Sequence, residues 1–423
     1  MKPFRCGVWL FVLTPLLMLD SALAQEKGKI SHQGDRYVER IEKRIRTAPG
    51  GTLYLSTERG SITINTWDRE EMQAVVEKKV EVFTETEAKA IFKDFQISVK
   101  KEGKNVRVTA ESSSGRRLRS LNAHFEITVP QKFNVDLETS GGNLDISDLE
   151  GDIIGRTSGG NIRVGNVKNG SVNIRTSGGN LTLTGVENGN VHARTSGGNI
   201  RVGDVSGDLT VKTSGGNITI SRTSGKVTAK TSGGNIKVEE SGADLDVDTS
   251  GGNITIKTAG GNVRAETSGG NITIGQTQGY VEAETSGGNI QVKGSGGPIN
   301  VSTSGGNIQI KGARGYIEAR TSGGSIQAEL VVSDPDTDTH CTLRSSGGDI
   351  VLYLPADVQA TIDAELRIRG QRRREYRIYS DFPIDIKGED TQTITGRGQV
   401  NGGGDPISLY TTNGDIRIKR LPE

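Results

Sequence analysis

The chain has 423 residues, and its 52 basic and 51 acidic side chains leave a formal net charge of +1. This near-neutral balance argues against a general nucleic-acid-binding protein, which needs an excess of positive charge. Two cysteines, Cys6 and Cys341, are too few for a scaffold held together by several disulfides.

Residues 1–24 have the pattern of a secretory signal peptide. Lys2 and Arg5 precede an apolar run at 8–19, and the small-residue sequence A-L-A at 22–24 marks a cleavage site. The apolar run is too short to span a bilayer, and no apolar stretch of about 18 residues follows it. We therefore expect an exported, soluble protein that is periplasmic, secreted or associated with the cell envelope.

Two segments precede the main repeats. Residues 25–48 are rich in charge, and we expect a weakly ordered lead-in there. Residues 49–138 contain several short stretches of alternating apolar and polar residues, which predict a β cap over the open edge of the repeats. One helix is expected at Glu85–Phe95, because its apolar residues recur at helical spacing: Ala88, Ile91, Phe92 and Phe95.

The stretch 139–330 repeats one short phrase, T-S-G-G-N-I, with few changes. A fixed short period over nearly half of a chain is typical of a solenoid. The threonine of the phrase recurs every 18 or 19 residues, at Thr139, Thr157, Thr176, Thr195, Thr213, Thr231, Thr249, Thr267, Thr285, Thr303 and Thr321.

Each repeat predicts two short strands and two turns. Apolar residues alternate from Ile200, and a second alternation begins at Leu209, nine residues later. The Gly-Gly pair is expected to supply the positive φ of a sharp corner. Because successive side chains of a strand point to opposite faces, we expect the inward set of this coil to be Ile200, Val202, Leu209, Val211 and Thr213.

These features predict an all-β fold: a single-chain β-solenoid, or β-helix, with about 18 residues and two short strands per coil. A left-handed hexapeptide helix would instead repeat its apolar marker about every six residues. A calcium-binding nonapeptide solenoid would need an aspartate in each repeat, and the phrase has none. We therefore expect neither a metal nor a cofactor.

Residues 331–423 are expected to add further solenoid coils and a closing cap. The next phrase starts at Ser345, 24 residues after Thr321, so the extra residues form a loop at 333–338. The three aspartates of this loop favour a solvated turn over a cation site, because nothing nearby supplies the remaining oxygen ligands. Cys341 follows, and we predict a small buried hydrophobe rather than a reactive thiol.

Several phrases outside and inside the repeats resemble one known family. They are G-G-T-L at 50–53, F-E-I-T-V-P at 125–130, the S-G-G-N-I repeats, S-D-F-P at 380–383 and N-G-D-I at 413–416. Together they resemble the bacterial putative-adhesin family of β-strand-repeat proteins, a domain of unknown function. The resemblance covers nearly all of the chain after the signal. It implies an all-β solenoid in an exported or envelope-associated protein and brings no catalytic residues with it.

The sequence gives little support for an enzyme. Polysaccharide hydrolases need carboxylates that converge in a groove. Asp246 and Asp248 share one strand face, but they are typical of a solvated edge. Apart from histidine, the repeats at 139–330 contain only two aromatic residues, Tyr280 and Tyr316. We expect a protein that is not an enzyme, with a polysaccharide-active β-helix enzyme as a remote alternative.

The outward residue before each repeat threonine changes its charge in blocks. If the coils stack in register, like charges lie about 4.8 Å apart, which is mildly unfavourable. One interpretation is that coils were duplicated in blocks. The other is a docking strip for an anionic polymer, with the acidic part setting polarity or pairing two solenoids antiparallel. The column reads Arg156, Arg175, Arg194, Lys212, Lys230, then Asp248, Glu266, Glu284, and finally Ser302 and Arg320.

Two classes of function follow from these patterns. The first is an adhesin or binding scaffold of the cell envelope, on a rigid rod about 50 Å long. Its partner would be an anionic envelope polysaccharide or another envelope protein, and we expect no nucleic acid. The second is a purely structural or stress-related periplasmic protein without a specific ligand.

Overall fold

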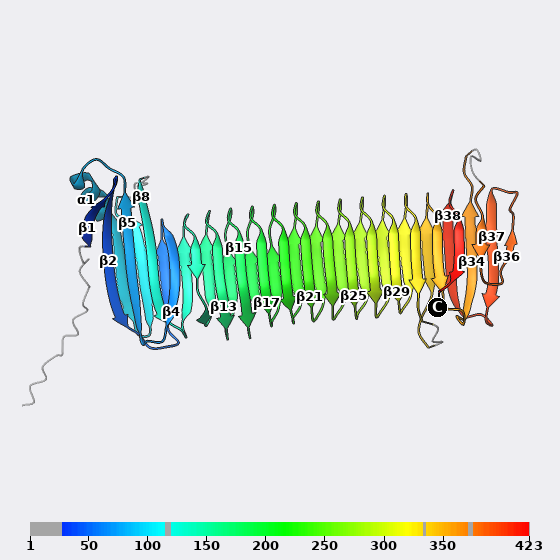
Figure 1. Ribbon diagram of the computed structural model, residues 1–423, viewed down its shortest axis with the longest axis horizontal. Helices are drawn as coiled ribbons and strands as arrows, with labels where there is room; N and C mark the ends of the chain where they lie inside the picture. The colour runs from blue at the N-terminus through cyan, green and yellow to red at the C-terminus, as the bar shows by residue number, and fades with distance from the viewer. Residues whose placement is uncertain (1–27, 115–119, 333–335, 371–374, 423) are drawn as a thin grey trace, which may run out of the picture.

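The structure, a computed structural model, describes residues 28–422 apart from 115–119, 333–335 and 371–374. The expected signal peptide at 1–24, with Cys6, lies outside the described residues. Two long β-sheets lie face to face and run the length of a straight rod (Figure 1). Among the residues that the structure describes, no helix has the length and apolar character of a membrane-spanning segment.

The regular part of the rod alternates between the two sheets, which we name sheet A and sheet B. Its sheet A strands are β10 (Leu144–Ile146), β11 (Leu149–Glu150), β13 (Ile162–Lys168), β15 (Leu181–Glu187), β17 (Ile200–Val205), β19 (Ile218–Thr223), β21 (Ile236–Ser241), β23 (Ile254–Ala259), β25 (Ile272–Thr277), β27 (Ile290–Ser295), β29 (Ile308–Ala313), β31 (Ile326–Leu330) and β33 (Ile350–Leu354). Its sheet B strands are β9 (Asn134–Thr139), β12 (Ile153–Thr157), β14 (Val172–Arg175), β16 (Val191–Arg194), β18 (Leu209–Lys212), β20 (Val227–Thr231), β22 (Leu245–Thr249), β24 (Val263–Thr267), β26 (Val281–Thr285), β28 (Ile299–Thr303), β30 (Ile317–Thr321) and β32 (Cys341–Ser345).

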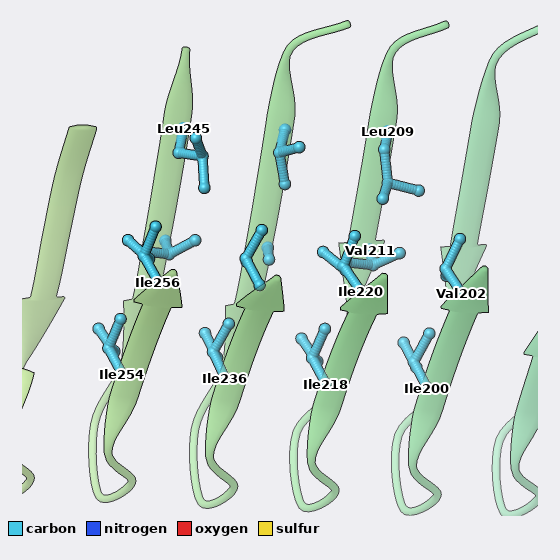
Figure 2. Packing of buried hydrophobic residues seen from close by; sticks show 14 of the residues in the cluster. Ile200, Val202, Leu209, Val211, Ile218, Ile220, Ile236, Leu245, Ile254 and Ile256 are labelled. Carbon is cyan, nitrogen blue, oxygen red and sulfur yellow. The ribbon is translucent and has the colours of Figure 1, made fainter. Parts of the chain in front are cut away.

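Successive coils stack as parallel strands in register. In sheet A, Ile200 of β17 pairs with Ile218 of β19, one coil further along. All five residues predicted to point inward in this coil, from Ile200 to Thr213, are at most 7% exposed. Figure 2 shows Ile200, Ile218, Ile236 and Ile254 in one row between the sheets, so each aliphatic residue packs on its equivalents above and below. The predicted all-β solenoid is therefore confirmed.

The N-terminal end extends both sheets in an order that departs from the chain order. Sheet A continues through β4 (Ser61–Trp67), β8 (Leu121–Pro130), β5 (Glu71–Val80), β2 (Arg36–Arg46) and β1 (Lys29–Gln33). Sheet B continues through β3 (Thr52–Thr57), β7 (Asn105–Ser112) and β6 (Phe95–Glu102). The first coil, β3 and β4, thus lies between β7 and β8 on one side and β9 and β10 on the other.

Two features of this end bear on the sequence predictions. Helix α1 (Glu85–Asp94) begins at its N-cap Thr84, whose side chain accepts the N–H of Glu87, and it buries Ala88 and Phe92 as expected. The expectation of a weakly ordered lead-in at 25–48 is wrong for residues 29–46, which form β1 and β2. The reason is that β2 pairs with β5 over ten positions and turns Ile41 and Ile45 toward the core.

The C-terminal end is also interleaved. After β33 the chain forms β34 (Ala360–Arg367), β35 (Ile378–Ser380), β36 (Asp385–Lys387) and β37 (Thr393–Val400), then returns as β38 (Asp405–Thr412) and β39 (Ile416–Arg420). Strand β38 pairs in parallel with both β32 and β34, and β39 pairs with both β33 and β35. The final coil is therefore inserted between two coils that precede it in the chain.

The break in the period near residue 330 also has a structural basis. The extra residues form the connection between β31 and β32, and part of the acidic loop at 333–338 lies outside the described residues. Within its described part, the Asp338 carboxylate contacts the His340 ring at 2.7 Å. Cys341 begins β32 and is fully buried, and this burial raises the pKa of its thiol. The predicted buried hydrophobe at Cys341 is confirmed.

Candidate functional site

The repeated threonine is used by the fold itself. Thr213 Oγ1 donates to the carbonyl of Gly198 in the preceding coil at 2.9 Å and accepts the N–H of Gly216 at 3.3 Å. The same pair of bonds recurs in the neighbouring coils at Thr195 and Thr231. These hydroxyls are buried and satisfied, so they are not available to a ligand.

One glycine of each phrase is required for space, and neither is required for a positive φ. None of them is among the glycines with positive φ, so the expectation of positive φ at the corner is wrong. A Cβ on Gly216 would lie 2.0 Å from the carbonyl oxygen of Gly198, whereas one on Gly215 would lie 3.5 Å from that of Gly197. The second glycine of each pair therefore allows successive corners to approach closely.

The asparagine of the phrase links one coil to the next. Asn199 Oδ1 accepts the backbone N–H of Asn217 at 2.8 Å, and Asn217 Oδ1 accepts that of Asn235 at 2.8 Å. Thr, Gly and Asn of the phrase each have a role in stacking, so the phrase needs no ligand to explain it. A binding site is better sought among the outward residues that vary from coil to coil.

The five basic residues singled out by the sequence lie in one column on sheet B. The register pairs Arg156 with Arg175, Arg175 with Arg194, and so on to Lys230. Neighbouring strands of a sheet are about 4.8 Å apart, so the cations repeat at about that interval. We name this column the basic stripe: Arg156, Arg175, Arg194, Lys212 and Lys230.

The two ends of the basic stripe are neutralised within the chain, and its centre is not. Arg156 lies 3.1 Å from Asp136, and Lys230 lies 3.4 Å from Asp246 and 3.8 Å from Asp248. Within the described residues, no carboxylate pairs with the three central cations, whose side chains are exposed: Arg175, Arg194 and Lys212. Adjacent unpaired like charges repel each other well within the screening length of about 8–10 Å, so an external anion would stabilise this surface.

The column that flanks the basic stripe on the same face is free of acidic residues alongside it. Each member of this second outward column lies two residues before the stripe residue of the same strand, and the register aligns the members of successive coils. The carboxylates of this column lie at the two ends of this stretch: Asp136 directly before Ile154, and Asp246 directly after Thr228. The members beside the basic stripe are Ile154, Asn173, His192, Thr210 and Thr228.

An acidic block continues the same column beyond Lys230. The register places Asp248 next to Lys230, followed by Glu266 and Glu284. Glu266 pairs with Arg264 of its own strand, whereas Glu284 has no basic partner within the described residues. We name Asp248, Glu266 and Glu284 the acidic block. Ser302 and Arg320 follow it in register.

The two aspartates considered for catalysis, Asp246 and Asp248, take part in ion pairs. Both aspartates lie close to Lys230, which makes them members of an ion-pair cluster on the partly exposed outer face of β22. Within the part of the chain that the structure describes, no group of three or more His, Cys, Asp or Glu side chains could hold a metal ion.

One buried polar site was not predicted from the sequence. Lys78 of β5 is fully buried, lies 2.9 Å from a carboxylate oxygen of Glu39 and donates to the carbonyl of Phe92 at 2.9 Å. Burial lowers the pKa of Lys78, while the hydrogen bond to Glu39 acts in the opposite direction. A signal was present, because Lys78 occupies an inward position in the alternation of Ala74, Val76 and Val80. The site tethers α1 to the cap.

Comparison with known proteins places the fold in a family. The family model described as Toastrack DUF4097 matches residues 52–293 and 239–419. No curated protein matches the chain.

Solved structures show only remote similarity. A putative cell adhesion protein from Clostridium sporogenes ATCC 15579 is 11% identical, covers 91% of this chain and 100% of its own, and has a TM-score of 0.17. A putative adhesin from Bacteroides fragilis NCTC 9343 is 15% identical, covers 63% of this chain and 97% of its own, and has a TM-score of 0.27. A putative lipid binding protein from Parabacteroides distasonis ATCC 8503 is 14% identical, covers 68% of this chain and 94% of its own, and has a TM-score of 0.18. With TM-scores this low, these similarities carry no argument about function.

Proposed function

The chain belongs to the Toastrack DUF4097 family, and from this premise we propose that it is a non-enzymatic, exported binding scaffold of the cell envelope, of adhesin type. Its ligand is an anionic polymer, such as an envelope polysaccharide, that docks along the basic stripe. The observation that carries the proposal is the set of three adjacent, exposed cations without a carboxylate partner: Arg175, Arg194 and Lys212.

The geometry of the basic stripe suits a polymer better than a small anion. A single phosphate or carboxylate would neutralise one or two cations, whereas an extended chain with regularly spaced anionic groups follows all of them at about 4.8 Å per coil. The flanking column carries no acidic side chain beside the stripe, so it does not repel such a chain. The parallel ladder holds the cations on a rigid support, which reduces the entropy lost on binding.

The proposal is tested by retention on an immobilised polyanion. The stripe variant is Arg175→Gln, Arg194→Gln and Lys212→Gln. Its matched control removes the same charge from exposed positions of sheet A: Arg201→Gln, Lys257→Gln and Lys293→Gln. We expect the wild type and the control to bind dextran sulfate beads at low salt and to elute as salt is raised, because exposed charges are screened.

The stripe variant should pass through the same column, and none of the three proteins should bind neutral dextran. Retention of the stripe variant at the salt concentration that retains the wild type would reject docking along the basic stripe. Circular dichroism of each variant would establish that its fold is intact.

A purely structural role is the second candidate, and one observation favours it. The Thr, second Gly and Asn of the repeated phrase all hold coil to coil, so selection for a stiff rod alone would preserve them. Under this alternative the stripe variant and the control behave alike on every polymer.

A further inference from the structure

The basic stripe and the acidic block form one continuous column whose charge reverses at a single step. The reversal lies between Lys230 and Asp248, which are paired in adjacent strands. On either side of this step the column reads Lys212 and Arg194 in one direction, and Glu266 and Glu284 in the other. If a second copy of this column runs in the opposite direction, its acidic residues lie opposite the basic residues of the first copy.

We propose that two copies of this chain pair antiparallel through their sheet B faces, about a two-fold axis that runs along the strand direction between the coils of Lys230 and Asp248. Rotation about this axis points the second rod in the opposite direction. Each column of one copy then lies opposite the same column of the other copy. Lys230 of each copy then faces Asp248 of the other, Lys212 faces Glu266, and Arg194 faces Glu284. The interface is isologous, as expected for a homodimer.

The register of the pairing follows from the charges. If the axis shifts to the coil of Lys230, this lysine faces its own copy, and if it shifts to the coil of Asp248, two carboxylates meet. Both shifts place like charges at the centre of the contact, which is unfavourable. In the proposed register no like charges meet in the column from Arg175 to Ser302. The one like pair, Arg156 with Arg320, lies at the ends of the face, where each arginine is paired within its own chain, with Asp136 and Glu318 respectively.

The flanking column is compatible with the same register. Its members pair as His192 with Glu282, Thr210 with Arg264, and Thr228 with Asp246, which places no like charges opposite each other. A parallel arrangement of the rods would instead place the basic stripe against neutral residues, and Asp248 and Glu284 against the carboxylates Asp246 and Glu282. Opposite charges would meet only where Glu266 faces Arg264 and Arg320 faces Glu318. Charge complementarity therefore selects the antiparallel arrangement.

The size of the face predicts a reversible dimer. From Arg156 to Arg320 the face is about ten coils or 48 Å long, and a four-residue strand spans about 13 Å. This gives about 600 Å² per copy, below the roughly 800 Å² of a standard interface. Lys230 and Glu266 also have partners within their own chain, so the pair of Arg194 with Glu284 contributes most.

The pairing would regulate the proposed polymer site, because it covers the basic stripe, and in this respect it rests on the proposed function. It predicts that low salt favours the dimer and that a polyanion competes with it. The test below measures the protein alone, so its result does not depend on whether a polymer binds.

Charge exchange tests the contact. The acidic variant is Arg194→Glu with Lys212→Glu, and the basic variant is Glu266→Lys with Glu284→Lys. By sedimentation velocity at low salt, the wild type should approach twice the mass of one chain with rising concentration. Each variant alone should stay monomeric, and an equimolar mixture of the two should dimerise again. A monomeric wild type at all concentrations, or a mixture that stays monomeric, would overturn the proposal.

Cysteine cross-linking tests the direction. Arg175 and Ser302 face each other in the proposed register, about 34 Å from their equivalents in the other copy. A mixture of Arg175→Cys and Ser302→Cys should be joined into a dimer by a short bis-maleimide, because packed sheets lie about 10 Å apart, which is too far for a direct disulfide. Neither variant alone should be joined to its own copy. The native Cys341 is fully buried and does not compete. Cross-linking of Arg175→Cys to itself would contradict the separation of about 34 Å and would overturn the proposed antiparallel register.

Discussion

Asn199 Oδ1 accepts the backbone N–H of Asn217 from the next coil at 2.8 Å. The same bond joins Asn217 to Asn235 and Asn235 to Asn253, so one side chain per coil ties each corner to its successor. Where the phrase ends, an aspartate takes over, since Asp349 Oδ1 accepts the N–H of Asp415 at 2.7 Å. The ladder therefore depends on a side-chain oxygen and not on the amide as such.

Replacing Asn217 with Ala should destabilise the rod locally, by about 1 kcal/mol, because the N–H of Asn235 loses its acceptor at a partly hydrated corner. Asn217→Asp should be nearly neutral, since it keeps the oxygen. Amide hydrogen exchange at Asn235 measures the effect, and we expect faster exchange only in the alanine variant. Equal exchange in both variants would show that the ladder bond contributes nothing.

The two glycines of one phrase should differ sharply in their tolerance of alanine. Gly216→Ala places a Cβ 2.0 Å from the carbonyl oxygen of Gly198, where backbone must move. We expect a loss of at least about 3 kcal/mol, or failure to fold. Gly215→Ala, with its Cβ 3.5 Å from the nearest oxygen, is the matched control and should change the melting temperature little. Similar melting temperatures for the two variants would contradict the steric explanation.

The cap should show a pH dependence that originates at Asp94. Hydrogen bonds from Ser114, Ser112 and Ser113 lower the pKa of this carboxyl from 3.8 to about 2. A depressed pKa in the folded state adds stability above the unfolded value, and this stability is lost as pH falls toward the folded value.

Asp94→Asn removes this contribution and should melt below the wild type at pH 7. The difference in melting temperature should shrink as pH falls from 3.8 to about 2, the interval set by the two pKa values. Thermal melts of both proteins across this range provide the measurement. A difference that stays constant with pH would exclude the carboxylate as its source.

The buried Lys78 should be costly to truncate singly and easier to replace together with its partner. Lys78→Ala leaves Glu39 and the carbonyl of Phe92 without a donor, and we expect the cap to lose about 3–5 kcal/mol. The double change Lys78→Met with Glu39→Leu should recover most of this loss. Denaturation followed by Trp67 fluorescence reports on the cap. If Lys78→Ala unfolds at the same denaturant concentration as the wild type, the ion pair does not contribute to the stability of the cap.

Much of the regular rod could be predicted, because each coil repeats the same local pattern. The alternation at Ile200 and Leu209 determines which side chains point inward, and the constant period forces equivalent residues into columns. The position of the basic stripe, with Arg175 and Arg194 side by side, follows from the same two facts. No long-range information was needed for these features.

The remaining features depend on contacts between distant segments. The role of Gly216 becomes visible only with the carbonyl of Gly198 in place. The strand at Arg36–Arg46 carries so many charges that its pairing with β5 was not expected. Local pattern also contains nothing that places β38 between β32 and β34, since this order is decided by which edges remain open when the strand arrives.

This interleaving constrains the order in which the rod can be assembled. A stack that grew one coil at a time from the N-terminus would close β32 against β34 and leave residues 405–420 without a place. The space between β32 and β34, and that between β33 and β35, must instead stay open, or reopen, until synthesis has reached Arg420. The distal cap can therefore close only after residues 405–420 have been made, and a product that lacks them would expose two unpaired strand edges in each sheet.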